Sequence, residues 1–278
     1  MTEKLNLFAR IKKWFKETIR WLFDFEDWKR LLRSIPSVVI ALFTLSVVCM
    51  NILANRELIN WVWVKEGPFS GIGLGLDCGF TLSWISFLFM DAICKRWGPK
   101  AATKISIFAL LINLVVTGIF AILMLTPGNW GAAYDAGNAM DVANGALNST
   151  LSGTWYVVLG SSVAMFVSAA VNSFTNWLIG KAVKDSDNEL TFKKFAARSF
   201  ISTGIAQFVD NLVFATLVSK LFFGWTWWMV LICSLVGALF ELLCEVVLSP
   251  LSFKMVKNWH KENVGYDYIN FINKKENN

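Results

Sequence analysis

The sequence predicts an all-α, polytopic membrane protein. The chain has 278 residues, of which 55% are hydrophobic and only 17% are charged. Its apolar residues gather in segments that are long enough for the roughly 20 residues that a helix needs to cross a bilayer. We therefore expect residues 34–254 to form a domain of six transmembrane helices, at approximately 35–55, 70–94, 105–126, 155–180, 199–222 and 227–253.

The distribution of basic residues predicts how these helices are oriented. All Lys and Arg residues except Arg56, Lys65 and Lys220 fall in segments that would lie on the same side of the membrane. Cytoplasmic loops are enriched in Lys and Arg, so both termini are predicted to be cytoplasmic. Residues 255–278 then form a cytoplasmic tail, and the protein is expected in the cell inner membrane as a multi-pass protein.

Residues 1–33 have the pattern of a basic amphipathic helix. Apolar residues recur at helical spacing, and lysine and arginine residues occupy the other faces. We expect this helix to lie in the cytoplasmic interface, where basic side chains are attracted to anionic headgroups. A helix that docks on a partner is the alternative.

Two glycine-rich stretches have separate interpretations. Residues 127–154 contain no basic residue, and form either a flexible external cap over a substrate entrance or a passive connector with some short helix. The glycines at 71, 73, 75 and 79 follow no strand of a βαβ unit, so a nucleotide-binding loop is not indicated. Close helix packing or a flexible helix start is the preferred explanation.

Polar side chains recur inside the predicted spans. The segment 198–214 contains Gln207, Asp210 and Asn211, whose spacing places them on adjoining faces of one helix. A charge in hydrocarbon costs at least ~2.5 kcal/mol, so such residues face a cavity or a partner. Further polar residues in or beside the spans are Asn51, Asp77, Asp91, Asn172, Asn176, Glu241 and Glu245.

This set contains several acids, but no Lys or Arg lies at comparable depth near the middle of the spans. Burial of these acids requires protonation, a cation or a hydrogen-bond donor, which a proton-coupled site or a donor-rich ligand supplies. For single residues a structural role remains open, because Asn172 and Asn176 can bond neighbouring helices and Asp77 and Asp91 can be interfacial.

The sequence contains little that supports catalysis or metal binding. His260 is the only histidine, so a His-based metal site or catalytic triad is not expected. The five cysteines lack CxxC spacing. We expect no cofactor, no metal, no enzymatic activity and no nucleic-acid partner.

Four segments resemble the VUT family of vitamin uptake transporters, which includes the bacterial queuosine precursor transporters. They are NILANR (51–56), FLFMDAICKRWGPKAA (87–102), RSFISTGIAQFVDNLVF (198–214) and ELLCEVVLSP (241–250). The resemblance covers the six spans but not the N-terminal helix. It implies uptake of deazaguanine bases across the inner membrane, and its matching positions are Asn51, Asp91, Arg198, Ser202, Gln207, Asp210, Glu245 and Pro250.

The resemblance and the polar pattern together give a set of expected roles. Asp210 and Gln207 would recognise the donor edge of a planar heterocycle, and Asp91 and Asn51 would complete or gate the site. Trp84 or Phe80 would stack on the ring. Ser202, Asn172 and Asn176 are further binding candidates, and Glu241 and Glu245 are candidates for proton coupling. The expected partners are a small-molecule substrate, the lipid bilayer and, in a homo-oligomer, further copies of the chain.

The sequence departs from the family pattern at three positions. Trp84 replaces a usual Pro, Lys95 replaces a usual Glu, and Glu241 replaces a usual Lys. The two charge inversions suggest that Lys95 and Glu241 form an ion pair between the second and sixth spans. With these three departures, a transported substrate other than a deazaguanine base remains an alternative.

Two alternative functions remain open. The chain could be the substrate-binding subunit of an energy-coupling-factor vitamin transporter, which would require an ATPase module as partner. It could also be a non-transporting membrane scaffold that is anchored by its amphipathic helix.

Overall fold

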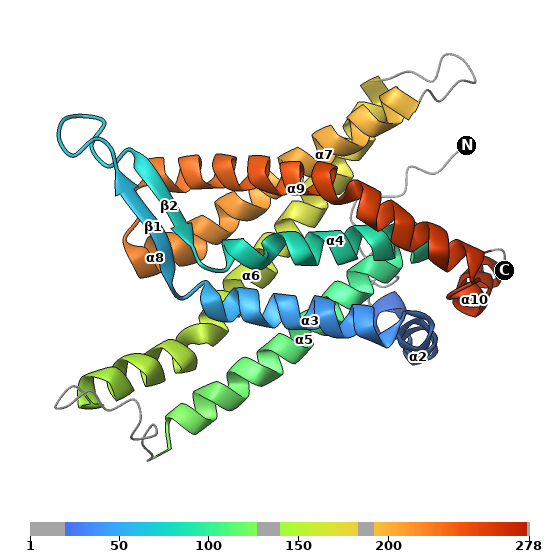
Figure 1. Cartoon of the computed structure of the whole chain (residues 1–278), viewed down its shortest axis with the longest axis horizontal. Helices are drawn as coiled ribbons and strands as arrows, with labels where there is room; N and C mark the ends of the chain where they lie inside the picture. Colours follow the sequence, from blue (N-terminus) through green and yellow to red (C-terminus); the bar gives the residue numbers. More distant parts are fainter. Residues whose placement is uncertain (1–19, 127–139, 183–191, 277–278) are drawn as a thin grey trace, which may run out of the picture.

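The computed structural model describes residues 20–126, 140–182 and 192–276, with some side chains at both ends of the second segment and at the start of the third left out. Figure 1 shows the order of the elements. They are α2 (Phe25–Ser34), α3 (Ser37–Leu53), β1 (Glu57–Val62), β2 (Gly73–Asp77), α4 (Phe80–Trp97), α5 (Pro99–Met124), α6 (Met140–Ala182), α7 (Phe192–Phe214), the π-helical turn η2 (Ala215–Ser219), α8 (Lys220–Phe223), α9 (Trp227–Lys261) and α10 (Tyr266–Glu276).

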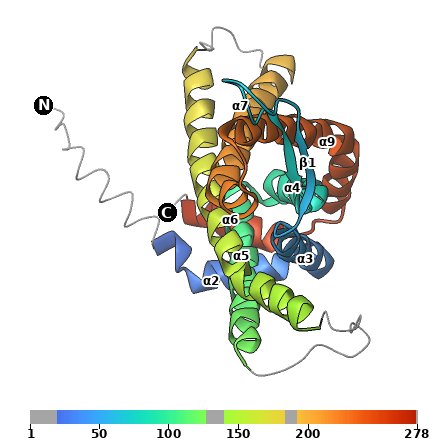
Figure 2. The ribbon, with the colours of Figure 1, turned by 90° about the vertical axis from the view of Figure 1, so that its left-hand side faces the viewer.

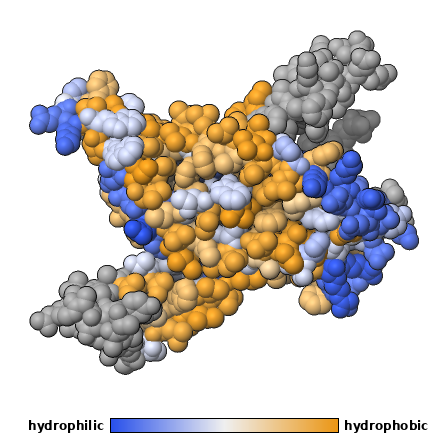
Figure 3. Space-filling model, in the orientation of Figure 1, coloured by the Kyte–Doolittle hydropathy of each residue, from blue (hydrophilic) through white to orange (hydrophobic). Residues whose placement is uncertain are grey.

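The structure confirms a mostly helical membrane protein, but it does not confirm six spans. Four stretches of the described chain are long and apolar enough to cross a bilayer, at Pro99–Met124, Leu147–Asn172, Thr203–Phe223 and Trp227–Lys261. The pair α2 and α3, which bends by 103°, makes a fifth if it counts as one span. Figure 3 shows an apolar band across the middle of the molecule, with hydrophilic residues gathered at its ends.

The packing of the long helices is cyclic. Helix α4 contacts α9, α9 contacts α7, α7 contacts α6, α6 contacts α5, and α5 contacts α4 again. Helix α3 packs against both α4 and α5. In Figure 2 α3, α4 and α9 are seen nearly end-on, whereas α6 runs lengthwise beside them. Polar groups on the inner faces of the helices are therefore brought together although they are far apart in the sequence.

The structure corrects the prediction of an all-α chain. Residues 57–62 and 73–77 form an antiparallel hairpin, so the predicted second span does not begin at residue 70 but at Phe80. A Cβ on Gly73 would lie 2.1 Å from the Trp61 carbonyl oxygen, and one on Gly75 would lie 2.4 Å from the Trp225 ring. For Gly73 and Gly75 the prediction of close helix packing or a flexible helix start is wrong, because they lie in β2 and allow it to approach Trp61 and Trp225. Gly79 precedes α4, and a Cβ there would lie 2.4 Å from the Met50 carbonyl oxygen of α3, which agrees with close helix packing.

The loop predicted at residues 127–154 is also shorter than expected. Helix α6 is already present at Met140, about four turns before the predicted start of the fourth span at residue 155. Residues 127–139 lie outside the described part of the chain, so the expectation of a cap there is not tested.

Local sequence signals explain where α4 and α5 begin. The Asp77 carboxylate accepts a hydrogen bond from the Phe80 amide over 3.1 Å, which satisfies a backbone donor at the start of α4. Gly98 has φ +90° and separates α4 from α5, and Pro99 occupies the first position of α5. Proline is favoured there because that residue has no helical partner for an amide proton.

Two short helices pack at the end of the molecule where α4 and α9 terminate. We call this the basic end, because Lys95, Arg96, Lys100, Lys254 and Lys257 lie there. The opposite end, which contains β1 and β2, is the hairpin end. Helix α2 contacts α10 at the basic end. The tail predicted at 255–278 thus contains the end of α9 and α10, while residues 1–19 of the predicted amphipathic helix lie outside the described residues.

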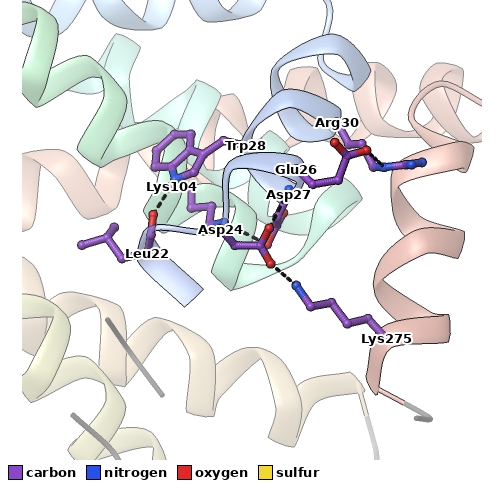
Figure 4. Close-up of polar contacts among 8 residues, drawn as sticks. All are labelled: Leu22, Asp24, Glu26, Asp27, Trp28, Arg30, Lys104 and Lys275. Atoms are coloured by element: carbon purple, nitrogen blue, oxygen red, sulfur yellow. Dashed lines mark hydrogen bonds and ion pairs between the residues drawn. The ribbon is translucent and has the colours of Figure 1, made fainter. Parts of the chain in front are cut away.

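A buried ion pair fixes α2 to the membrane domain. The Lys104 ammonium of α5 lies 2.8 Å from an Asp27 carboxylate oxygen, and both side chains are almost fully buried. The rings of Trp21 and Trp28 cover the ammonium at 5.2 Å each. Figure 4 shows this region, where the Asp24 carboxylate also accepts a hydrogen bond from Lys275 of α10.

Candidate functional site

A cavity of about 100 Å³ lies within the ring of helices. Its wall is formed by the end of α3, the end of β2, the first half of α4, the middle of α6, the end of α7 and the first half of α9. The polar residues in this wall are Asn51, Asp77, Ser83, Ser86, Ser161, Asp210, Asn211, Ser219 and Glu241, and the aromatic ones are Phe80, Phe87 and Phe214. We call it the central cavity.

The central cavity reaches a part of α9 that is far from both ends of this helix. Glu241 follows Trp227, the first residue of α9, by fourteen positions. At 1.5 Å per residue this is about 21 Å along the helix, whereas the hydrocarbon core is about 30 Å thick. Glu241 is only 4% exposed, so its side chain is buried in the middle part of α9.

Three carboxylates line this wall, and each accepts a hydrogen bond from the protein. Asp77 accepts from the Phe80 amide, as described above. Asp210 accepts from the Ser168 hydroxyl of α6 over 2.8 Å. Glu241 accepts from the Asn211 amide over 3.2 Å. None of the described residues that line the cavity is Lys or Arg. Like charges in a medium of low polarity repel, so the cavity favours a positive charge or additional donors.

Gly237 leaves room for the Asn211 side chain. A Cβ on Gly237 would lie 2.9 Å from Asn211 Nδ2, closer than side chains normally approach. The missing side chain therefore leaves the space in which the Asn211 amide reaches Glu241. Gly237 lies one turn before Glu241 on the same face of α9.

The structure places several predicted residues in the central cavity and others outside it. Asn51, Phe80, Asp210 and Glu241 line it. Gln207 is 4% exposed and does not line it, and neither its amide nitrogen nor its amide oxygen has a hydrogen-bond partner in the described structure. The roles assigned to these residues stay predictions.

A second, smaller cavity of about 10 Å³ lies between α4 and α9, nearer the basic end. Trp84, Asp91 and Glu245 line it, together with Phe87, Leu88, Cys244, Leu248, Ser249 and Ser252. The predicted binding residues are thus divided between two cavities. Trp84 lies beside the second cavity rather than the first.

The remaining predicted residues are on α6 and α7. Asn172 is half-buried in α6 and lines neither of these two cavities. The side chains of Asn176, Arg198 and Ser202 lie outside the described part of the structure.

The predicted ion pair between Lys95 and Glu241 is wrong. Lys95 instead pairs with Asp91 on its own helix, with 2.7 Å between nitrogen and oxygen. Glu241 faces the central cavity and bonds to Asn211. One helical turn separates Lys95 from Asp91, so the ammonium reaches this nearby carboxylate without leaving the surface.

The sequence alone did not identify Ser168 and Gly237 as parts of the site, and it left open whether Asp77 lies at the membrane edge. The sequence did indicate Asn211 as a site residue, because it follows Asp210 directly and lies four residues after Gln207. Among the described residues, no group of three or more His, Cys, Asp or Glu side chains is arranged to hold a metal ion.

Comparison with known proteins identifies the family. The model of the family described as "putative vitamin uptake transporter" matches residues 77–255, more than half of the chain. No curated protein and no solved structure gives a significant match. The matched region begins at Asp77 and contains α4 to α8 and most of α9. It includes all three carboxylates of the central cavity. The chain is a multi-pass membrane protein that belongs to the vitamin uptake transporter family.

Proposed function

We propose that this chain imports a small planar heterocycle with adjacent hydrogen-bond donors, namely a deazaguanine base that is a precursor of queuosine. The observation that supports this most is the central cavity, in which Asp77, Asp210 and Glu241 face a space without Lys or Arg among its described lining residues. Such a site accepts donors and disfavours anions.

The chemistry of a deazaguanine fits these groups. Its exocyclic amine and adjacent ring N–H lie side by side, so one carboxylate can accept both hydrogen bonds. Asp210 is the proposed acceptor, and the amide of Asn211 or Asn51 is the proposed partner for the carbonyl edge. Phe80 lies in the wall with its ring 4.7 Å from that of Phe240, and it offers an aromatic face to the base.

The size of the cavity supports a transport cycle. A cavity of about 150 Å³ holds benzene, whereas the central cavity has about 100 Å³. A bicyclic base therefore requires the surrounding helices to separate. In a transporter this separation is part of the cycle, because the site opens to one side of the membrane at a time.

The proposed orientation has six spans, with the basic end in the cytoplasm. Under this proposal α3, α4, α5, α6, the α7–α8 segment and α9 each cross the bilayer. The excess of Lys and Arg at the basic end supports it. Glu241 is the proposed proton-coupling residue, since its carboxylate faces the central cavity and accepts a hydrogen bond from Asn211. Glu245 is the second candidate.

The test is uptake of a radiolabelled deazaguanine into liposomes that contain only this purified chain. We expect uptake that increases with an inward proton gradient and is competed by unlabelled base. Binding without uptake would indicate a subunit that needs an ATPase module. Absence of both uptake and ligand-dependent thermal stabilisation would contradict a transport function and favour a scaffold.

A further inference from the structure

We infer that the substrate leaves the central cavity between α4 and α9, and that Asp91 and Glu245 form a second binding site for the same donor-bearing heterocycle on this route. The inference rests on the proposed function for the nature of its ligand. The route itself follows from the packing of α4 and α9.

Phe87 separates the two cavities. It lines the central cavity and also lines the smaller cavity that contains Asp91 and Glu245. One aromatic side chain thus belongs to both walls. Rotation of Phe87 away from α9 would connect the two cavities in the direction of the basic end.

The second cavity repeats the chemistry of the first. Each contains more than one carboxylate and an aromatic ring, here Asp91, Glu245 and Trp84. A planar heterocycle that presents donors to Asp210 can present the same donors to Asp91 or Glu245. The cavity of about 10 Å³ is closed around this chemistry and requires α4 and α9 to move apart before it admits a ring.

A hydrogen bond links the two helices at this point. The Ser252 hydroxyl of α9 donates to Asp91 Oδ2 of α4 over 2.9 Å, and the Lys95 ammonium bonds the same oxygen. Ser252 is 1% exposed, so this contact is shielded from water. We call the contact between Ser252 and Asp91 the latch.

Helix α9 has a proline hinge, Pro250, next to the latch. Pro250 lies inside α9, lacks an amide proton and leaves the carbonyl of Val246 without its helical partner. The Ser249 hydroxyl donates to this carbonyl over 2.8 Å. Figure 1 shows that α9 bends in this part. Ser252 lies two residues beyond Pro250. Tilting of the part of α9 that follows Pro250 would therefore break the latch and leave Glu241 in place.

Cysteine labelling tests the route without any substrate. Cys233 lines the central cavity, so it is retained while Cys49, Cys78, Cys94 and Cys244 are changed to alanine. In inside-out vesicles, Ser252→Ala should raise the rate at which a membrane-impermeant maleimide labels Cys233 by at least threefold. Ser252→Thr, which keeps the hydroxyl, should label at a rate near that of the parent.

Ser162→Ala is the matched control, because the Ser162 hydroxyl donates to Val158 O within α6. It should leave the labelling rate unchanged. The route is refuted if Ser252→Ala labels at the rate of the parent, or if its faster labelling occurs only from the other face of the membrane.

Ligand protection tests the second site. Cys244 lines the smaller cavity, and a variant that retains only this cysteine is labelled in the Ser252→Ala background. Saturating deazaguanine should slow its labelling by at least twofold. Protection of Cys233 without protection of Cys244 would overturn the second site, whereas protection of neither would refute the proposed substrate and leave the labelling test of the route valid.

Discussion

Asn211 of α7 donates a hydrogen bond to Glu241 of α9, and the two side chains face the central cavity together. The contact depends on Gly237, whose absent side chain leaves room for the Asn211 amide. It connects two helices that are both in the wall of the cavity, so a shift of either helix changes the position of a carboxylate.

Gly237→Ala should weaken ligand binding. The added methyl group displaces Asn211 from Glu241, and we expect the dissociation constant of a deazaguanine, measured by equilibrium binding to purified protein, to increase about tenfold, the equivalent of ~1.4 kcal/mol. Gly118→Ala in α5 is the control, since no atom lies within 4 Å of a Cβ there. Equal affinities of the two variants would show that Asn211 does not position Glu241 for the ligand.

The buried pair of Lys104 and Asp27 should contribute strongly to stability as a unit. Asp27→Asn leaves a buried ammonium without its counter-charge, and the loss of one partner of such a pair costs about 3–5 kcal/mol. We expect a large decrease in the melting temperature in detergent. Glu26→Gln breaks only the exposed pair with Arg30, and should change the melting temperature little.

The double variant Asp27→Leu with Lys104→Met checks the reason for this effect. Removal of both charges restores a packed apolar contact, which is often neutral in buried pairs. Its melting temperature should lie well above that of Asp27→Asn. A double variant as unstable as the single one would mean that packing rather than charge explains the loss.

The contact of Asp24 with Lys275 should make stability depend on pH. The hydrogen bond from Lys275 holds the pKa of Asp24 below its ordinary value of 3.8. A carboxyl whose pKa is lowered by folding stabilises the protein above its unfolded-state pKa, and this contribution disappears as the pH falls through the folded-state pKa.

Asp24→Asn is suited to this test, because Asn also caps helix N-termini. The melting temperature of the parent should exceed that of the variant by a constant amount at neutral pH, and the difference should narrow below about pH 4. A difference that is the same at neutral pH and in acid would exclude the charge of Asp24 as its cause.

The hairpin should depend on its glycines. The Trp225 indole donates to Glu57 over 2.5 Å and packs across β2. Gly75→Ala would push Trp225 away, and we expect faster proteolysis of the segment between β1 and β2 together with a lower melting temperature. Gly67→Ser is a comparison at a turn where no atom lies within 4 Å of a Cβ. It has positive φ, so it should cost some stability but leave Trp225 in place. Equal proteolysis of both variants would contradict the role of the Gly75 contact.

The long apolar helices α5, α6 and α9 were predictable because apolar length and helical spacing are local properties of the sequence. The hairpin was not, because the apolar residues between Gly71 and Phe80 resemble the start of a span, and only the approach of Trp225 and Trp61 explains the glycines. The site was partly predictable. Buried acids such as Asp210 and Glu241 are conspicuous in an apolar segment. The placement of Asp91 and Glu245 in a second cavity, by contrast, depends on how α4 and α9 pack. The donors Ser168 and Asn211 could not be assigned to Asp210 and Glu241 from spacing, since each bond joins different helices.

The most direct test of the account is the binding of a deazaguanine to purified Asp210→Asn. The account predicts that this variant folds, with a melting temperature close to that of the parent, but binds at least tenfold more weakly and transports no base. Asp267→Asn, which makes the same change at an exposed position of α10, should bind as the parent does. Binding and uptake by Asp210→Asn at the level of the parent would contradict the claim that the acids of the central cavity hold the substrate.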